Sequence, residues 1–255
     1  MILGIDIGNS NIVIGYIEKG KVMDVFRLET DTSMSVKEYS ITIKAVMEDS
    51  KIDSTAFEGT IICSVVTTLT PVLSEVLHIL TGFEPLILNS ELKTGLNYSI
   101  ESPEKLGSDR IADCVAAAAK YPLPAVVIDF GTATTFSVIG YNSVFLGGAI
   151  APGLKTSVRA LSQGTSQLSS ISLAAPESCI GINTDECIKS GIVLGTASMV
   201  DGMIDRFEKQ LETKVSIVAT GGLAHLVTPH CSKKLIHDDN LLLQGLSLIF
   251  EMNKD

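Results

Sequence analysis

The chain has 255 residues, 45% of them hydrophobic, which suits one large or two small packed domains and argues against disorder. Its net charge of −10 opposes binding to nucleic acid and to anionic membranes, because no local basic patch offsets it. No apolar run reaches the roughly 18 residues of a membrane span, and the N-terminus lacks the basic head of a signal peptide, so we expect a cytoplasmic protein with no membrane partner.

The N-terminal stretch ILGIDIGNSN, residues 2–11, predicts a buried strand that ends in a tight hairpin turn. Asp6 stands at the end of this strand, and Gly8 can adopt the backbone angles of the turn. The segments IVIGYIE and VMDVF follow, separated by the turn KGK, so we expect a three-stranded meander.

Strands and helices alternate after this meander, as in an α/β layer. We expect a surface helix over 36–48, a strand over 60–66, a helix from Thr70 to about Leu80, and a short strand over 86–88. Thr70 followed by Pro71 is typical of a helix N-cap followed by proline in the first turn. Residues 94–103 read as a loop.

An alanine-rich helix is expected over 106–121, and its start, Gly107-Ser108-Asp109-Arg110, combines an acid with a guanidinium. The plain interpretation is a helix start in which Ser108 caps and Asp109 complements the helix dipole. The dipole does not favour Arg110 at this end, so we expect an anion to compensate its charge.

The stretch VVIDFGTATTF, residues 126–136, repeats the N-terminal design, with Asp129 matching Asp6 and Gly131 matching Gly8. A carboxylate followed by the hydroxyls of Thr132, Thr134 and Thr135 can hold a cation beside a polyphosphate. The alternative is a plain hairpin with threonines on its solvent face.

The second copy continues into its own meander, FSVIG, YNS and VFLGGAI, so the chain reads as a duplicated α/β domain. We expect domains over 1–117 and 118–255, with the last helix, over 241–252, able to pack back on the first. Two hairpin loops would then face each other across a cleft and clamp one nucleotide.

The remaining elements lie in the second half. We expect a helix from Leu154, a polar surface loop over 162–178, a long helix over 185–211 with breaks near Gly191 and Gly195, and a strand over 215–219. The Thr220-Gly221-Gly222 turn should open a further helix and let backbone amides approach the nucleotide. The five cysteines and four histidines show no metal-ligand spacing, so we expect reduced structural thiols.

Taken together, DIGNSN (6–11), GSDR (107–110), DFGTATT (129–135), GGAIAPG (147–153), IGINT (180–184) and ATGG (219–222) resemble type III pantothenate kinase. That resemblance implies two ribonuclease H-like domains of the actin-like ATPase superfamily, with mixed sheets and a nucleotide cleft between them. It also implies ATP-dependent phosphorylation of pantothenate, the first step towards coenzyme A. The expected cofactors are Mg²⁺ and a monovalent cation, K⁺ or NH₄⁺, and the expected assembly is a homodimer.

The resemblance also assigns roles to single residues. Asp109 would be the general base, Asp129 would hold the monovalent cation, and Asp6 would lie near Mg²⁺. ATP would contact Asp6, Ile7, Gly8, Asn9, Ser10, Asn11, Ile12, Val13 and Thr132, in addition to Gly221 and Gly222. Pantothenate would contact Gly107, Ser108, Asp109, Arg110 and Thr184. The family usually has alanine at the position of Ser108. It has a tyrosine that lines the substrate pocket at the position of Ile100.

Two alternatives remain open at this point. One is another small-molecule kinase of the same superfamily, since a fold does not fix the acceptor. The other is a non-enzymatic nucleotide-binding regulatory relative. For assembly, the run GIVLGTASMVDGMI at 191–204 spreads apolar residues around much of one helix, which indicates either a dimer interface or a helix buried in its own domain.

Overall fold

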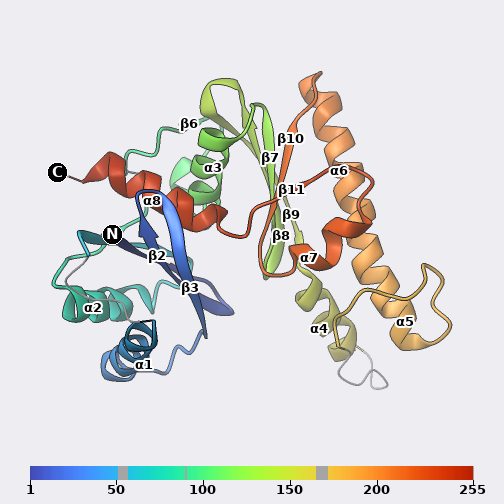
Figure 1. Cartoon of the computed structure of the whole chain (residues 1–255). Coiled ribbons are helices and arrows are strands. Elements are labelled where there is room, and N and C mark those ends of the chain that lie inside the picture. The colour runs from blue at the N-terminus through green and yellow to red at the C-terminus, as the bar shows by residue number, and fades with distance from the viewer. Residues whose placement is uncertain (51–56, 90, 165–171, 255) are drawn as a thin grey trace. The chain divides into compact units, whose positions relative to one another are not determined.

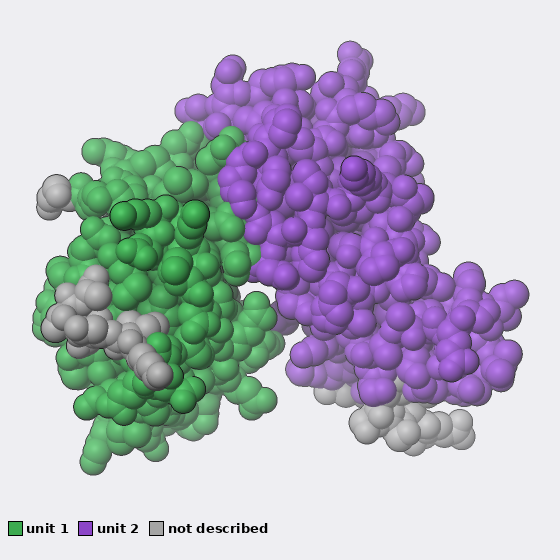
Figure 2. All heavy atoms as spheres, in the orientation of Figure 1, with its two compact units in different colours: residues 1–96, 100–119, 240–255 green, residues 97–99, 120–239 purple. Residues whose placement is uncertain are grey.

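A computed structural model describes residues 1–50, 57–89, 91–164 and 172–254 (Figure 1). The chain divides into two compact units, which Figure 2 colours separately. The first contains residues 1–96, 100–119 and 240–255, and the second contains residues 97–99 and 120–239. The C-terminal helix belongs to the first unit. From the sequence, the domain boundary is expected after residue 117, with this helix able to pack back on the first domain.

The first unit is built on a mixed sheet with strand order β3-β2-β1-β4-β5, in which β1 is antiparallel to β2 and parallel to β4. Its strands are β1 (Ile2–Ile7), β2 (Asn11–Glu18), β3 (Lys21–Glu29), β4 (Gly59–Ser64) and β5 (Leu86–Ile87). Its helices are α1 (Val36–Asp49), α2 (Thr70–Thr81), α3 (Ser108–Lys120) and α8 (Leu241–Asn253).

Helices cover both faces of this sheet (Figure 1). Alternate residues such as Ile5 and Ile62 pack against α1 and α2, whereas Ile61 and Cys63 pack with α3 and α8. Strands buried on both faces explain the continuous apolar runs of the sequence. At one crossing a Cβ on Gly245 of α8 would collide with α3 backbone, so this glycine permits the close approach of the two helices.

The second unit contains a mixed sheet with strand order β11-β10-β7-β8-β9-β6. Its strands are β6 (Asn97–Tyr98), β7 (Ala125–Phe130), β8 (Ala133–Gly140), β9 (Val144–Pro152), β10 (Ser216–Thr220) and β11 (Ile236–His237). Its helices are α4 (Leu154–Gly164), α5 (Thr184–Lys189), α6 (Gly195–Leu211) and α7 (Ala224–Val227), and a π-helical segment, Ser190–Leu194, joins α5 to α6.

The two sheets confirm the predicted duplication. The second sheet contains the order β9-β8-β7-β10-β11 where the first has β3-β2-β1-β4-β5. Corresponding neighbours are parallel in both sheets or antiparallel in both. Asp6 and Asp129 occupy equivalent places, each one residue before the last residue of its strand. The intervening β6 pairs with β9 as an additional edge strand of the second sheet.

The long helix of the second unit packs inward with its apolar residues. Ile192, Val193, Val200 and Ile204 are buried against this unit's sheet, whereas Gly191, Gly195 and Ser198 are exposed. The run therefore separates into an apolar inner face and an outer face of small residues, which differs from the expected spread of apolar surface around the helix.

By length and composition, the 28-residue stretch Thr184–Leu211 is the one helical segment among the described residues that could cross a membrane. Core helices of globular proteins pass the same test, and this helix supplies core residues to the second unit. Its buried and partly buried apolar residues pack within that unit.

Two helix starts differ from the prediction. The N-cap of α2 is Leu69, and Thr70 is already helical, with its hydroxyl hydrogen-bonded to Ser64 Oγ at 2.8 Å and to Val66 O at 3.2 Å. In α3 the carbonyl of Gly107 accepts the first helical bond, from the Ile111 amide, so Ser108 does not cap. Both hydroxyls bond to the end of β4 or to the loop after it, because that backbone offers them partners.

Candidate functional site

The turn between β1 and β2 is held by Thr30, the residue that follows β3. The Gly8 amide donates to Asn11 O at 3.0 Å, which closes the turn. Thr30 donates through its hydroxyl to Gly8 O at 2.7 Å and through its amide to Ser10 O at 3.2 Å. These contacts point loop carbonyls towards Thr30, and Asn9, Ser10 and Asn11 are exposed. The loop is therefore fixed while its outer surface can meet a ligand.

The carboxyl ends of β1 and β4 and the start of α3 meet at one edge of the first sheet. Asp6 lies opposite Cys63 in the parallel register of β1 and β4. The Cys63 thiol donates to Ser108 Oγ at 3.3 Å. Burial, and then the charges of Asp6 and Asp109, raise the pKa of this thiol well above its usual value, so it stays protonated at neutral pH. The structure thus brings Asp6, Ser108 and Asp109 together at this edge.

Asp109 and Arg110 stand at the first turn of α3, and both are half-buried. Oδ1 of Asp109 accepts the Arg110 amide at 2.8 Å and lies so close to Gly107 that a Cβ there would overlap it. Burial lowers the pKa of Arg110, and Cys114 and Asp109 partly offset this effect. The guanidinium nevertheless stays charged at neutral pH and offers a planar fork for a carboxylate.

An equivalent edge exists in the second unit. Asp129 lies opposite Thr220 in the parallel register of β7 and β10, and the half-buried carboxylate packs against Gly131 and Gly221. Thr132 O accepts the Gly153 amide at 3.2 Å and the Thr156 hydroxyl at 2.7 Å, which fixes the β7–β8 turn. The Thr132 residue itself is exposed.

The Gly221-Gly222 turn leads into a short helix. This helix, α7, is only four residues long and begins at Ala224. The Leu223 amide donates to Phe130 O at 3.3 Å and the Ala224 amide to Gly221 O at 3.1 Å. These two amides are therefore engaged within the protein, and the exposed Gly222 is the part of the turn that a ligand can approach.

Thr184 stands apart from the Asp129 group on another element. It is the first residue of α5, and its N-cap, Asn183, accepts the Glu186 amide through its side chain. Thr184 is exposed, as are Ile182 and Asn183 before it. The predicted site residues thus form one group in the first unit and one in the second, and Thr184 belongs to neither group of contacts.

The described part of the chain contains no cluster of three or more His, Cys, Asp or Glu residues that could hold a metal ion. Mg²⁺ that is bound through one or two carboxylates and the phosphates of a nucleotide does not need a dedicated protein cage. Asp6, half-buried at a strand end, is a donor of that type. Asp129 is likewise a hard oxygen donor beside threonine hydroxyls.

Several residues that shape these edges were not singled out by the sequence. Thr30 and Thr156 hold the two turns, and Cys63 joins Asp6 to Ser108. One signal could have identified Cys63, because the duplicated pattern aligns it with Thr220 opposite the second carboxylate. The threonines give no local signal.

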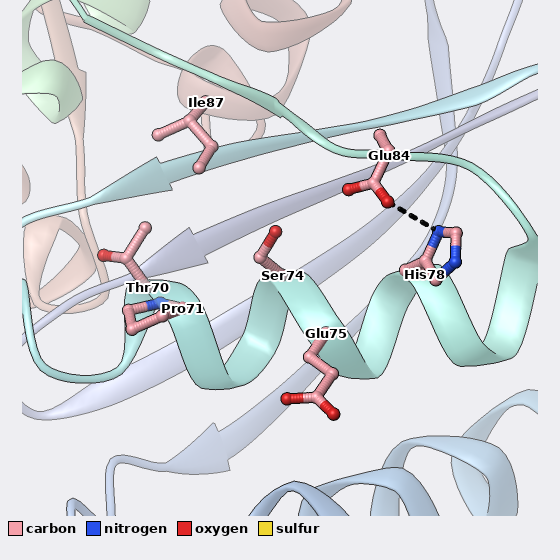
Figure 3. A pocket seen from close by; sticks show the side chains of 7 residues that line it. All are labelled: Thr70, Pro71, Ser74, Glu75, His78, Glu84 and Ile87. Carbon is pink, nitrogen blue, oxygen red and sulfur yellow. Dashed lines mark ion pairs between the residues drawn. The ribbon is translucent and has the colours of Figure 1, made fainter.

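A pocket of about 460 Å³ lies elsewhere in the first unit, between α2 and the segment around β5 (Figure 3). His78 and Glu84 both line it, and their side chains point toward each other, with His78 Nδ1 3.1 Å from Glu84 Oε1. Its lining contains none of the predicted site residues. We therefore place the chemistry at the strand ends and not in this pocket.

Similar structures show the fold. A solved structure described as a Baf family transcriptional activator from Campylobacter jejuni matches with a TM-score of 0.60 at 22% identity, covering 98% of both chains. Component A of (R)-2-hydroxyglutaryl-CoA dehydratase from Acidaminococcus fermentans matches with a TM-score of 0.56 at 13% identity, covering 96% of this chain and 94% of that one. The fold is that of the actin-like ATPases and sugar kinases.

Sequence comparison gives the family. A family model described as type III pantothenate kinase matches residues 2–206. The type III pantothenate kinase of Exiguobacterium sp. is 37% identical over 255 residues, covering both chains completely. That of Roseiflexus sp. is 38% identical over 254 residues, again with complete coverage of both chains. The chain therefore belongs to the type III pantothenate kinase family.

Proposed function

We propose that this protein transfers the γ-phosphoryl group of ATP to the primary hydroxyl of pantothenate, the first step of coenzyme A biosynthesis. The observation that carries this proposal is the similarity to type III pantothenate kinases along the whole chain. The two carboxylates at equivalent strand ends and the acid–guanidinium pair at the start of α3 supply the groups that such a transfer needs.

Asp109 acts as the general base in this proposal. Because its Oδ1 already accepts the Arg110 amide, Oδ2 is the oxygen that receives the proton of the alcohol. As this proton leaves, the alcohol oxygen forms a bond to the γ-phosphorus, and the bond between that phosphorus and the bridging oxygen of ADP breaks. Transfer of this kind depends mainly on positioning and charge stabilisation.

Arg110 binds the carboxylate of pantothenate. A half-buried guanidinium whose pKa is lowered by burial is stabilised by an anion, and its fork matches a carboxylate with two parallel bonds. Gly107 and Ser108 shape the same turn, and Thr184 contributes a hydroxyl to the acceptor.

The two hairpin turns hold ATP. The loop from Asp6 to Val13 contacts the phosphates, Thr132 contacts them from the second turn, and Gly221 and Gly222 approach the nucleotide with their backbone. Mg²⁺, when bound with ATP near Asp6, neutralises charge on the phosphates. A carboxylate at a strand end is suited to this role because it reaches the ion and leaves its other positions to phosphate oxygens and water.

Asp129 holds a monovalent cation, K⁺ or NH₄⁺. The carboxylate is kept in place by Gly131 and Gly221, and the neighbouring turn contributes hydroxyl and carbonyl oxygens. One carboxylate among neutral oxygens suits a weakly held hard cation.

The protein is a homodimer that uses the outer face of α6. Gly191, in the π-helical segment before α6, and Gly195 and Ser198 in α6 are exposed. A Cβ built on Gly191, Gly195 or Gly202 would meet no atom of the described residues within 4 Å beyond its chain neighbours and its own helix backbone. Small residues on one helix face allow a second backbone to approach closely. Two strongly exposed isoleucines, Ile180 and Ile182, precede α5 and add apolar surface. A two-fold dimer uses this surface twice.

An assay that couples ADP release to a spectroscopic signal tests the function. Pantothenate, pantetheine and common sugars are each offered with ATP and Mg²⁺ to the purified full chain. We expect turnover with pantothenate at a rate far above ATP hydrolysis without acceptor. Phosphorylation of a sugar in preference to pantothenate would instead support the other small-molecule kinases, and no acceptor-dependent ADP with any compound would support a regulatory role.

A further inference from the structure

The hydroxyl of Ser108 joins the start of α3 to the end of β4. It donates to Ser64 O at 3.0 Å, accepts from the Ser64 amide at 3.2 Å, and accepts from Cys63 Sγ at 3.3 Å. Ser108 is only 8% exposed. One donor and two lone pairs are thereby all used, which is the full capacity of a hydroxyl.

These hydrogen bonds use backbone groups at the end of β4 that β5 does not pair. β5 pairs with Ile61 and Ile62 of β4, and Leu88 donates to Ile62 O at 2.8 Å. Ser64 is two residues further along β4, so its amide and carbonyl point to the same side as those of Ile62. β5 ends at Ile87, and the backbone of Ser64 bonds to the Ser108 hydroxyl where a longer strand would continue the ladder.

This contact constrains the residue next in the chain. Asp109 follows Ser108 directly, and its carboxylate is folded over Gly107 with Oδ1 bonded to the Arg110 amide. Ser108 fixes the first turn of α3 to β4, and Asp6 on β1 lies opposite Cys63 on β4. The position of the Asp109 carboxylate relative to Asp6 is therefore set. The capping role predicted from the sequence does not account for these bonds, because the hydroxyl bonds to another strand.

We propose that Ser108, which this chain has in place of the family's usual alanine, is a positioning residue for phosphoryl transfer: in this chain its hydroxyl holds the start of α3 on β4 so that Asp109 meets the acceptor hydroxyl in reacting geometry. This inference rests on the proposed function and on Asp109 as its general base. Small displacements of a reacting group lower the rate of transfer more than they lower binding.

Ser108→Ala removes the hydroxyl without adding bulk. We expect kcat to fall about 10- to 100-fold while the KM for ATP stays within about twofold. Ser35→Ala is the matched control in the same unit, because Ser35 caps α1 through bonds to Glu38 and belongs to no predicted site. It should lower the unfolding temperature by a similar amount and leave kcat unchanged. A kcat of Ser108→Ala within twofold of the wild type would overturn the proposal.

A double-mutant cycle separates positioning from general loosening. If Ser108 acts through Asp109, the Ser108→Ala substitution should lower the residual turnover of Asp109→Asn by less than about twofold. The same 10- to 100-fold loss in both backgrounds would overturn the proposal, because Ser108 would then act independently of Asp109.

Amide hydrogen exchange tests the contact without any turnover. The Ser64 amide should exchange at least about tenfold faster in Ser108→Ala, whereas the Val65 amide, which donates to Ile7 O at 3.1 Å, should be unchanged. Unchanged exchange at Ser64 would overturn the contact. A wild-type chain that is inactive on pantothenate yet shows the Ser64 effect would overturn the proposed function and with it the positioning role, while leaving the contact established.

Discussion

Gly221 lies directly against the carboxylate of Asp129. A Cβ on Gly221 would overlap Oδ1 of Asp129 and would stand 2.6 Å from the Phe130 amide nitrogen. The residue also has a φ of +92°, in the region that side chains disfavour. Two separate constraints therefore require glycine here, and one of them concerns the proposed cation ligand.

Gly221→Ala should abolish most of the activity by displacing Asp129. We expect kcat/KM for ATP to fall at least about 100-fold, with a loss of stability of about 1–3 kcal/mol from the strained backbone. Gly82→Ala is the control, because Gly82 has a φ of +77° at the end of α2 and a Cβ added there would meet no atom of the described residues within 4 Å beyond its chain neighbours. Steady-state kinetics and thermal unfolding of both variants distinguish the overlap from the strain, and equal kinetics in the two would argue against a role for Asp129.

Asp109→Asn should stop phosphorylation and leave ATP binding intact. Loss of a general base typically removes about 10²- to 10⁴-fold in rate, whereas the ATP loop lies on a different element. Calorimetric titration with ATP and the coupled assay measure the two properties separately. Near-normal turnover of this variant would contradict the general-base role and would mean that Asp109 only stabilises the start of α3.

Activity should depend on K⁺ or NH₄⁺. Replacing K⁺ by tetramethylammonium at constant ionic strength should lower turnover on the order of 10-fold, because the proposed site at Asp129 would lose its ion. Asp129→Asn keeps the shape of the side chain and removes its charge, so this variant should be slow in both salts. Equal wild-type rates in the two salts would remove the monovalent site.

The chain should form a dimer through the exposed small residues of α6. Light scattering at low micromolar concentration should give twice the 27.1 kDa of one chain. Ser198→Glu places a charge on this face and should give the monomer mass together with a loss of activity. Gln210→Glu adds the same charge to an exposed residue beyond the small-residue face and should remain dimeric. A wild-type mass near 27.1 kDa would exclude the dimer.

Tyr16→Phe should stabilise the protein. The Tyr16 hydroxyl is buried and has no hydrogen-bond partner within the described ranges, while its ring packs with Phe26 and Phe57 at centroid distances of 5.6 and 6.0 Å. Removing an unsatisfied hydroxyl and keeping the ring should raise the free energy of unfolding by about 1 kcal/mol at neutral pH. Urea unfolding measures the difference, and a destabilised variant would mean that the hydroxyl has a partner after all.

The same substitution has a pH dependence of known sign. Burial, and then the charge of Asp24, raise the pKa of Tyr16 from 10.0 to about 12 in the folded state. Between these values the unfolded tyrosine loses its proton first, so the wild type loses stability as the pH rises from 10.0 to about 12. The advantage of Tyr16→Phe should therefore grow over this range, and a constant difference would contradict the raised pKa.

The sequence by itself determined most of the secondary structure and the duplication. Runs such as ILGIDIG and VVIDFG are continuous apolar strands that end in a carboxylate and a glycine, and turn chemistry of this kind is local, so a pattern search finds it. The family followed from the same motifs, because their order and spacing are properties of the chain.

Only the tertiary structure decided how polar side chains are used. Ser108 and Thr70 each look like helix-start residues, and each donates instead to β4 or the loop after it, in the case of Ser108 to a residue 44 positions away. A hydroxyl can satisfy a local amide or a distant backbone group at similar free energy, so packing selects the partner. The exposure of Gly191 and Gly195 and the close approach of Gly221 to Asp129 were likewise decided by the tertiary structure, because they depend on which elements meet when the chain folds.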